Sequence, residues 1–468
     1  MAYFEQSDLE KWSRGEWVNT HSVPPIRGFS IDSRNVDSNE MFIALRSEKR
    51  DGHAFVGDAA RRGASAALTE QFVPDAGIPQ LKVKQGSRAL QDIALNHRLR
   101  FKGSVVGVTG SCGKTSTKDL ISLLLGEKRV LKTAGNFNNT LGVPLTLLRL
   151  DSEQHDFGVV EAGINTRDEM SELAGMIDPE IGVVTMIGRA HLEGLGSLDA
   201  VAKEKATLLT GRRQMHAVVY PLACHGYAAF KNLDHTTNRV LCPLGEWIPS
   251  DPWIQPVLYW SVSETRGRWS IFLQESGKPR RKFVVGNLSA GMRQNAALAI
   301  LTASELGVSD ADIQWRLMLW HPSANRGEVL QTANGWVYSD CYNANPDSMI
   351  DSLRAFEATF EPSYSRLYVL GSMHELGSDS AIYHEEVGSK LRLRACDRAI
   401  CVGRDASAFF NGLVAAGNAP EQVALASTTD EIALLVSAFE GVVFLKGSRA
   451  NRLERLIPEN STPIPSYP

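Results

Sequence analysis

The sequence predicts an α/β protein of three domains. Its 468 residues are too many for a single hydrophobic core, and domains of ordinary size would number about three. Patterns typical of buried strands and of helices alternate along the chain, most regularly from residue 321 onward. We therefore expect an N-terminal domain over 1–98, a central domain over 99–320 and a C-terminal domain over 321–468.

The composition excludes several classes of protein. Hydrophobic residues make up 43% of the chain and charged residues 22%, as in ordinary globular proteins. A net charge of −4 gives no overall attraction to nucleic acid or to anionic membranes. No apolar run reaches the roughly 20 residues of a membrane span, and the first residues lack the apolar segment of a signal peptide. The six cysteines have no zinc-binding spacing, so we expect a cytoplasmic enzyme with reduced thiols.

A phosphate-binding loop is predicted within residues 105–125, VVGVTGSCGKTSTKDLISLLL. A β-branched run predicts a buried strand, and small residues then lead to Lys114 and Thr115, which open a helix. Backbone N–H groups of such a turn point at a phosphate, the lysine neutralises it, and the threonine hydroxyl can bind Mg²⁺. The alternative is an ordinary strand-to-helix turn. The expected nucleotide contacts are Gly110, Ser111, Cys112, Gly113, Lys114, Thr115 and Ser116.

Polar side chains follow the next two buried strands. Glu161 ends the strand FGVVE, where a carboxylate beside a phosphate loop can hold Mg²⁺ or pair with a cation. His191 comes just after the strand IGVVTMI, and it is either a ligand or a structural histidine. The next helix carries Lys203 and Lys205, which point to different faces because helical neighbours are three or four residues apart.

Two further clusters have both a binding and a structural interpretation. Ser33 and Arg34 lie between two short strands of the N-terminal domain, where the arginine could bind a phosphate or form a surface ion pair in a capped turn. Asn138 and Asn139 lie in a glycine-bounded loop, which suits either a polar ligand or a plain turn.

Residues 221 to 290 are harder to interpret. Alternating segments such as RWSIFLQ and RKFVVGN predict strands, and we expect a β-rich insertion here. We expect its aromatic residues to pack in the insertion: Trp247, Trp253, Trp260 and Trp269.

The sequence of the C-terminal domain predicts an open, mostly parallel, Rossmann-like sheet with helices on both faces, because strand and helix patterns alternate regularly. Such sheets bind ligands at the carboxyl ends of their strands. Polar residues gather there: Asp340, Asn343, Asn345, His374, Glu375, Lys446, Ser448 and Arg449. Two such domains suggest closure over a nucleotide, for phosphoryl transfer to a small molecule, ATP-driven bond formation or a hydrolysis-driven switch.

The motifs, in their order along the chain, resemble those of the Mur ligase family. TGSCGKTS, GNFNNTLGVP, EAG at 161–163, AHLEGLGS, DCYNANPDSM, VLGSMHELG and FLKGSR look like the MurF type, which joins D-alanyl-D-alanine to UDP-N-acetylmuramoyl-tripeptide in peptidoglycan synthesis. DSR and DGHAF are similar to the family's uridine-nucleotide domain. The resemblance is weakest over 221–285. It implies a small α/β uridine-nucleotide domain, a central P-loop ATPase-like domain and a C-terminal Rossmann-like ligase domain.

The resemblance implies ATP-dependent amide formation through an acyl phosphate. The tripeptide carboxylate attacks the γ-phosphate, and the amine of D-Ala-D-Ala then attacks the acyl carbon. The family uses two Mg²⁺ ions, which here would be held by Thr115, Glu161, His191 and a carbamylated lysine. That lysine matches Lys205, with Lys203 as the alternative, and the implied catalytic residues are Lys114, His191 and Lys205.

The resemblance also implies the remaining contacts. Asn295 matches the residue that contacts adenine, and Arg326 and Asn343 match other nucleotide contacts. The expected substrate contacts are Ser33, Arg34, Asn138, Asn139, Asn345, Lys446 and Ser448. We expect a monomer with no nucleic-acid or membrane partner. The alternatives are a ligase adding a single amino acid, a folylpolyglutamate-type ligase, and a P-loop kinase or nucleotide switch. The third residue of the peptide, diaminopimelate or lysine, stays open.

Overall fold

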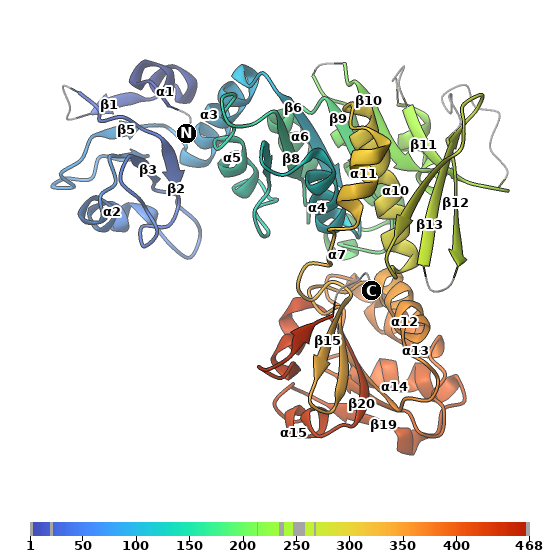
Figure 1. Ribbon diagram of the computed structural model, residues 1–468. Coiled ribbons are helices and arrows are strands. Elements are labelled where there is room, and N and C mark those ends of the chain that lie inside the picture. The colour runs from blue at the N-terminus through green and yellow to red at the C-terminus, as the bar shows by residue number, and fades with distance from the viewer. Residues whose placement is uncertain are drawn as a thin grey trace.

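The protein consists of three α/β units, each built on its own sheet (Figure 1). The structure is a computed structural model that describes residues 3–18, 22–212, 214–233, 238–246, 258–265 and 268–464. Trp247 and Trp253 of the expected aromatic packing, and residues 465–468 of the tail, lie outside the described residues. The three sheets are mostly parallel, so the predicted α/β class is confirmed.

The N-terminal unit has a five-stranded sheet in the order β1-β5-β4-β3-β2, antiparallel only between β1 and β5. Gly63, with a φ of 109°, ends α2 in the left-handed conformation that glycine adopts without strain. The strands are β1 Glu16–Val18, β2 Gly28–Ser30, β3 Glu40–Ile43, β4 Ala66–Thr69 and β5 Gln80–Lys82, and the helices are α1 Gln6–Ser13, α2 Val56–Arg62 and α3 Gly86–Arg100.

The central unit has a nine-stranded sheet in the order β14-β13-β12-β11-β10-β9-β6-β8-β7. Its strands are β6 Ser104–Thr109, β7 Val130–Lys132, β8 Phe157–Glu161, β9 Ile181–Val184, β10 Ala217–Pro221, β11 Asn238–Pro243, β12 Leu258–Thr265, β13 Arg268–Glu275 and β14 Arg281–Val285. Its helices are α4 Lys114–Leu125, α5 Gly142–Leu147, α6 Glu169–Ile177, α7 Leu192–Leu195, α8 Leu198–Ala206, α9 Ala228–Lys231, α10 Ala290–Glu305 and α11 Asp310–Leu317.

Residues 221 to 290 contain the expected strands. β11 pairs in parallel with β10, and β12 to β14 continue from it, so these strands extend the central sheet. Trp260 and Trp269 pack at the edge of the core that α4 and α10 form with the sheet. The local pattern predicted these strands but not their pairing partner.

The C-terminal unit has a seven-stranded sheet in the order β19-β18-β17-β20-β16-β15-β21, with parallel pairing from β19 to β16. Helices α12 to α14 pack on one face and α15 on the other, as expected for a Rossmann-like sheet. Its strands are β15 Glu328–Thr332, β16 Gly335–Ser339, β17 Arg366–Gly371, β18 Arg398–Val402, β19 Val423–Ala426, β20 Gly441–Lys446 and β21 Thr462–Pro463, and its helices are α12 Pro346–Thr359, α13 Ser380–Ser389, α14 Ala406–Ala415 and α15 Ala433–Ser437.

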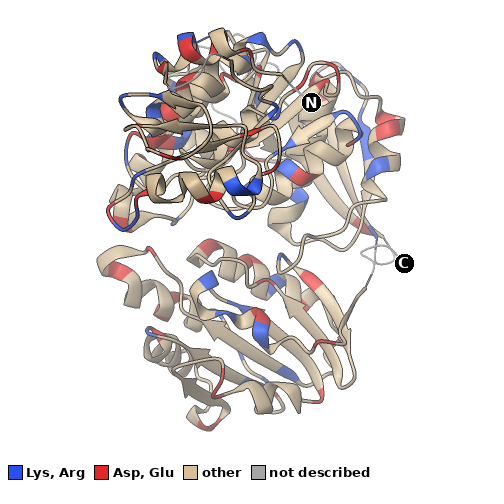
Figure 2. Ribbon diagram, turned by 90° about the vertical axis from the view of Figure 1, so that its left-hand side faces the viewer, with Lys and Arg blue, Asp and Glu red and all other residues tan. Residues whose placement is uncertain are grey.

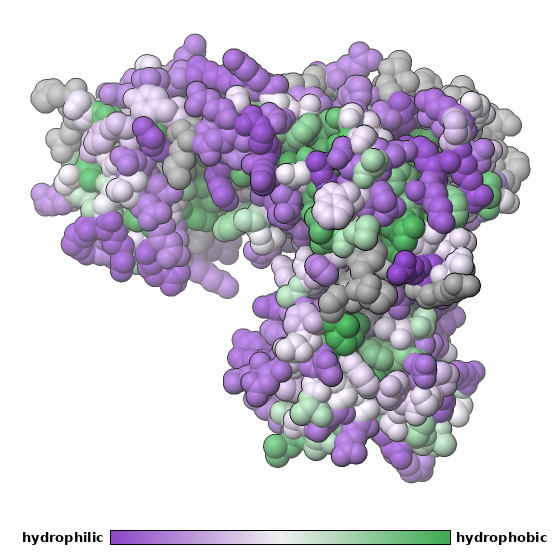
Figure 3. Space-filling view, in the orientation of Figure 1, coloured by the Kyte–Doolittle hydropathy of each residue, from purple (hydrophilic) through white to green (hydrophobic). Residues whose placement is uncertain are grey.

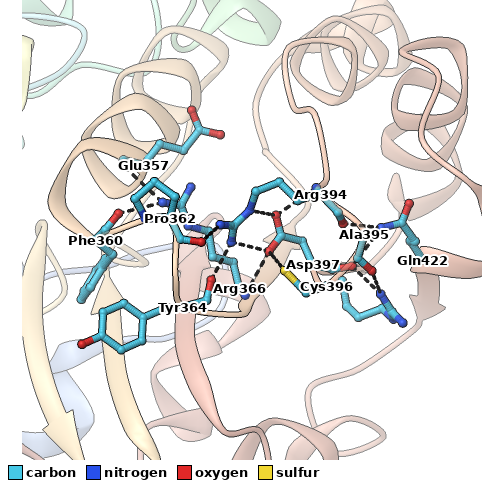
Figure 4. Close-up of polar contacts among 11 residues, drawn as sticks. Glu357, Phe360, Pro362, Tyr364, Arg366, Arg394, Ala395, Cys396, Asp397 and Gln422 are labelled. Carbon is cyan, nitrogen blue, oxygen red and sulfur yellow. Dashed lines mark hydrogen bonds and ion pairs between the residues drawn. The ribbon is translucent and has the colours of Figure 1, made fainter.

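A buried ionic network closes the amino ends of the C-terminal strands (Figure 4). Asp397 is 1% exposed and accepts hydrogen bonds from Arg394 Nε at 2.8 Å and Nη2 at 2.7 Å. Arg366 donates from its backbone N–H to Asp397 and from Nη2 to the carbonyl of Phe360, at the end of α12. The network therefore ties β17 and β18 to α12 at the end of the sheet opposite to the carboxyl ends of the strands.

The units are arranged in an L, with the central unit at the corner (Figure 1). Helix α3 packs on α5 and α6, so one hydrophobic core continues from the N-terminal unit into the central unit. Positions of basic residues and positions of acidic residues are interspersed along the ribbon (Figure 2). No described helix is both long and apolar enough to cross a membrane.

Candidate functional site

The segment predicted to bind phosphate, called the phosphate loop below, forms a turn between the end of β6 and the start of α4. Its glycines are required by their surroundings. Gly113 has a φ of 83°, and a Cβ there would lie 2.4 Å from Asn295 Nδ2. A Cβ on Gly110 would lie 1.8 Å from Thr185 Oγ1. The loop is therefore a close-packed turn that opens a helix, and α10 brings the predicted adenine contact Asn295 directly against it.

Side chains of the loop form hydrogen bonds within the loop and with the segment that follows β9. Lys114 Nζ donates to the Gly110 carbonyl at 2.8 Å, and burial lowers the pKa of Lys114. Ser111 Oγ donates to the Gly188 carbonyl at 3.0 Å, which ties the loop to the segment after β9. Burial raises the pKa of Cys112, so this thiol stays protonated and fills space in the loop. Ser116 is buried in the first turn of α4.

Glu161 is 2% exposed and connects the loop with the asparagine segment. Its Oε2 accepts from Thr115 Oγ1 at 2.9 Å, and its Oε1 accepts from Asn138 Nδ2 at 2.8 Å. The buried Lys118 Nζ lies 4.0 Å from Oε2. The structure thus brings together Thr115, Glu161 and Asn138, whereas Asn139 Oδ1 accepts from the backbone N–H of Gly142 and has a structural role in the turn.

His191 and Lys205 lie on the other side of the loop. Strands β8, β6 and β9 are neighbours, so the residues that follow them meet at one edge of the sheet. Burial lowers the pKa of His191, and the charges of Lys114 and Lys205 lower it further. Lys205 is fully buried, and its Nζ has no hydrogen-bond partner among the described residues. Burial and the nearby charge of Lys114 hold the pKa of Lys205 well below its usual value. Lys203, on the same helix, is exposed.

The residues predicted to bind metal at this edge of the sheet differ in chemical type. In the described part of the chain, no three His, Cys, Asp or Glu side chains gather as a metal site. Thr115 and Glu161 already share a hydrogen bond of the kind that a divalent cation replaces with two oxygen ligands. The neutral imidazole of His191 and the unpartnered amine of Lys205 fit a second ion, provided that the amine is converted to an anion.

Predicted residues of the C-terminal unit lie at the ends of the neighbouring strands β16, β20 and β17. Lys446 is 2% exposed, and its Nζ donates to Asp340 Oδ2 at 2.6 Å and to the Asn343 carbonyl at 3.3 Å. Ser448 Oγ accepts from the backbone N–H of His374 at 3.0 Å. Asn345 caps α12, since its Oδ1 accepts from the Ser348 N–H at 2.8 Å. Internal partners thus hold Lys446, Ser448 and Asn345 in place.

The carboxyl ends of β6, β8 and β9 in the central unit face those of β16, β17 and β20 in the C-terminal unit. His191 Nδ1 lies 2.6 Å from Glu375 Oε2, across the boundary between the central and C-terminal units. Arg189 Nη2 lies 2.8 Å from Asp347 Oδ1 across the same boundary. Asp340 and Lys446 come close enough to the loop for their charges to act on Cys112. A nucleotide in the phosphate loop would therefore contact both units.

A cavity of about 450 Å³ lies between the same two units. It is lined by the start of α10, the connection from the central to the C-terminal unit, β15 and β16, and the end of α12, with Met292, Trp320, Arg326, Tyr338 and Phe360 among its residues. Arg326 stacks on Tyr342, with its guanidinium carbon 3.9 Å from the ring centre. The lining of the cavity combines aromatic and aliphatic side chains with polar ones, which suits a planar base that also forms hydrogen bonds.

Ser33 and Arg34 lie in the N-terminal unit, far along the chain from the loop. Arg34 donates to Asp32 from Nε at 2.9 Å and from Nη2 at 2.7 Å, which is the surface ion pair considered as the alternative. They also line a pocket of about 350 Å³ together with Asp58, Arg61 and Arg62. The sequence reasoning missed Arg61 and Arg62, although the pair of arginines at the end of a predicted helix was a usable signal.

Two other side chains at the site were also missed. Lys118 lies one turn beyond the loop and was visible in the sequence as a charged residue on the apolar side of a helix. Glu375 was noted at a strand end but not assigned, because its contact with His191 joins residues far apart in the chain.

Comparisons with known proteins agree over most of the chain. Residues 25–98 match the family model described as Mur ligase family, catalytic domain, residues 108–242 the Mur ligase middle domain, and residues 325–449 the Mur ligase, glutamate ligase domain. The chain is similar to the UDP-N-acetylmuramoyl-tripeptide–D-alanyl-D-alanine ligase of Haemophilus influenzae, at 30% identity over 92% of this chain and 93% of the relative.

Further relatives give the same result. The ligase of the same name from Treponema pallidum is 31% identical over 92% of this chain and 93% of its own. Among solved structures, MurF from Acinetobacter baumannii has a TM-score of 0.82 at 25% identity, covering 97% of this chain and 98% of the other.

Proposed function

The chain belongs to the Mur ligase family, and on that premise we propose that it joins D-alanyl-D-alanine to UDP-N-acetylmuramoyl-tripeptide in an ATP-dependent ligation of peptidoglycan synthesis. The observation that carries the proposal is the meeting of two sets of strand ends. The phosphate loop, Glu161 and His191 of the central unit face Asp340, Glu375 and Lys446 of the C-terminal unit. Such a site can hold a triphosphate on one side and an acceptor on the other.

The first half of the reaction activates the carboxylate of the tripeptide. One carboxylate oxygen attacks the γ-phosphorus, the bond to the β-γ bridging oxygen breaks, and ADP leaves with that electron pair. Lys114 neutralises the phosphates beside the backbone N–H groups of the loop. We propose that the adenine base lies toward the cavity beside Met292 and Arg326, with Asn295 at the loop.

Mg²⁺ is the metal that we propose for this site. When bound, it neutralises the phosphate oxygens during transfer of the phosphoryl group. Thr115 and Glu161 would hold one ion, and His191 with Lys205 a second. The neutral, unpartnered amine of Lys205 is suited to attack CO₂, which would give a carbamate and release one proton. This modification turns a side chain that would repel Mg²⁺ into an anionic ligand.

The second half of the reaction makes the amide. The free amine of D-Ala-D-Ala attacks the acyl carbon, and the tetrahedral intermediate collapses with loss of phosphate. Lys446, Ser448 and Asn343 are the candidates for contact with nucleotide or dipeptide from the C-terminal unit.

The shape of the molecule supports a substrate that spans two units. The N-terminal and C-terminal units leave an open angle between them on one face (Figure 3). We propose that the basic pocket at Ser33, Arg34, Arg61 and Arg62 binds the uridine diphosphate. The peptide would then extend toward the phosphate loop. Because one chain supplies every candidate residue, we propose a monomer, acting in the cytoplasm where ATP and nucleotide precursors occur.

Phosphate release tests the assignment. Purified protein is given ATP, Mg²⁺, UDP-N-acetylmuramoyl-tripeptide and D-Ala-D-Ala, with each substrate omitted in turn. We expect phosphate only when both substrates are present. Release with neither substrate would contradict a ligase and favour a nucleotide switch. Dependence on D-Glu or a diamino acid in place of the dipeptide would indicate a ligase adding one amino acid.

A further inference from the structure

Two loops from different units meet at His191 and Glu375. His191 follows β9 and begins α7, and Glu375 follows β17. Both residues have left-handed backbones, with φ of 57° and 61°. The Glu193 N–H donates to the Glu375 carbonyl at 3.1 Å, which fixes one loop against the other. A non-glycine residue in this conformation is uncommon, and two in contact indicate that the packing of the loops determines it.

The side chains of this pair approach more closely than the backbones. His191 Nδ1 lies 2.6 Å from Glu375 Oε2. The imidazole is 15% exposed, whereas Glu375 is 52% exposed. The contact is a short ion-pair distance without the angle of a standard hydrogen bond. At this distance an ionised carboxylate, which can only accept, would repel a bare lone pair on Nδ1, so the contact favours the proton on that nitrogen. The lone pair of a neutral His191 is then on Nε2.

We propose that Glu375 is a positioning residue, which fixes the orientation and tautomer of His191 so that Nε2 is presented to the metal of the nucleotide site. Histidine ligands of metals commonly donate their other N–H to a carboxylate, and this contact raises the basicity of the ligand. The metal role of His191 rests on the proposed function. The contact with Glu375 rests on the geometry alone.

The consequence concerns the assembly of the site. Glu375 belongs to the C-terminal unit, while His191 and the phosphate loop belong to the central unit. The histidine is therefore held in its metal-binding orientation only when the C-terminal unit is docked. Separation of the two units would free the imidazole to rotate and would weaken metal binding before any substrate reacts.

The experiment compares four variants of the full chain by two readouts. Glu375→Gln removes the charge at a half-exposed position, and Glu375→Ala removes the contact. Glu386→Gln is the matched control, because Glu386 pairs with Arg189 across the same boundary but does not contact His191. Binding of Mn²⁺ in the presence of ADP is measured by electron paramagnetic resonance. The tautomer of His191 is measured by ¹⁵N NMR without metal, with His191→Ala identifying its signals.

We expect Glu375→Gln to weaken Mn²⁺ binding about tenfold and Glu375→Ala by up to about 100-fold, the range for a carboxylate behind a histidine ligand. Glu386→Gln should change it less than twofold. In the unsubstituted protein His191 should carry its proton on Nδ1, and Glu375→Ala should give a mixture of tautomers.

Three results would overturn the proposal. Equal effects of Glu375→Gln and Glu386→Gln would reduce Glu375 to a general contact between units. A proton on Nε2 of His191 in the unsubstituted protein would contradict the geometry. Unchanged Mn²⁺ binding in His191→Ala would remove the metal role of the histidine. In each case, phosphate release that requires both substrates would still support the ligase assignment, so the two failures are distinguishable.

Discussion

Lys205 is notable because no contact among the described residues accounts for its buried amine. It is completely buried, its Nζ has no partner among the described residues, and the charge of Lys114 acts against a second cation nearby. A buried ammonium without a counter-ion is costly, so burial favours the neutral form of this amine. Lys203, two residues earlier, faces solvent and has no such constraint. The two lysines of one helix can therefore be told apart.

Replacement of Lys205 tests its proposed role as a carbamylated ligand. Lys205→Ala should lower the rate of phosphate release by at least about 100-fold, since it removes charge stabilisation at the phosphates. A short carboxylic acid should restore part of the rate by taking the place of the carbamate. Lys203→Ala is the control and should keep nearly full activity. Full activity of Lys205→Ala would remove this residue from the mechanism.

At the scale of elements, local patterns predicted most of the fold. The strand that ends at Thr109, the glycine turn and the helix from Lys114 follow from residues that are neighbours in sequence. The long-range pairings did not follow. The local pattern at 221–290 left open that β11 joins β10, and nothing local to Glu375 showed that His191 lies opposite. Contacts between distant segments are set by packing, which a single sequence does not display.

Asp397 tests the buried network of the C-terminal sheet (Figure 4). Asp397→Asn removes the buried charge and replaces one accepting oxygen by an NH2 donor facing Arg394, and should lower the free energy of unfolding of this unit by about 3 kcal/mol. The measurement is denaturant unfolding followed by a probe in the C-terminal unit. ADP binding to the folded protein should be unchanged, because the network lies at the far end of the sheet. An unchanged unfolding midpoint would show that the network contributes nothing to stability.

The carboxylate of Asp397 also makes the stability of the folded protein depend on pH. Burial opposes the charge of Asp397, but the hydrogen bonds from Arg394 and Arg366 outweigh it and hold its pKa below the usual value. A carboxyl group whose pKa is depressed in the folded state stabilises the folded protein at pH values above the pKa of the group in the unfolded chain. For aspartate that pKa is about 4. The stability difference between the unsubstituted protein and Asp397→Asn should therefore be constant above about pH 5 and shrink as the pH falls below 4. A difference that grew on acidification would contradict the sign.

At the scale of the whole molecule, the contact between the central and C-terminal units sets the site. Arg189 pairs with Asp347 and Glu386 of the C-terminal unit, beside the contact of His191 with Glu375. Both contacts lie at the edge where the phosphate loop meets the strand ends of the C-terminal unit. The arrangement of units and the completeness of the site are therefore linked.

Arg189→Gln tests this link. The loss of two partly buried ion pairs should favour separation of the units by about 1 to 3 kcal/mol. The radius of gyration in small-angle scattering should rise, and MgADP should reduce that rise. Arg129→Gln is the control, because Arg129 pairs with Asp156 inside the central unit. Equal scattering from Arg189→Gln and the unsubstituted protein would show that other contacts hold the units together.

The fate of one carboxylate oxygen tests most directly whether the reaction proceeds through an acyl phosphate. The tripeptide carboxylate is labelled with ¹⁸O, and the phosphate released during turnover with ATP and D-Ala-D-Ala is analysed by mass spectrometry. An acyl phosphate requires that a carboxylate oxygen bond to the γ-phosphorus and leave with it when the amine attacks the acyl carbon. We expect ¹⁸O in the released phosphate, in proportion to the amide formed. Unlabelled phosphate would contradict activation of the carboxylate at the phosphate loop.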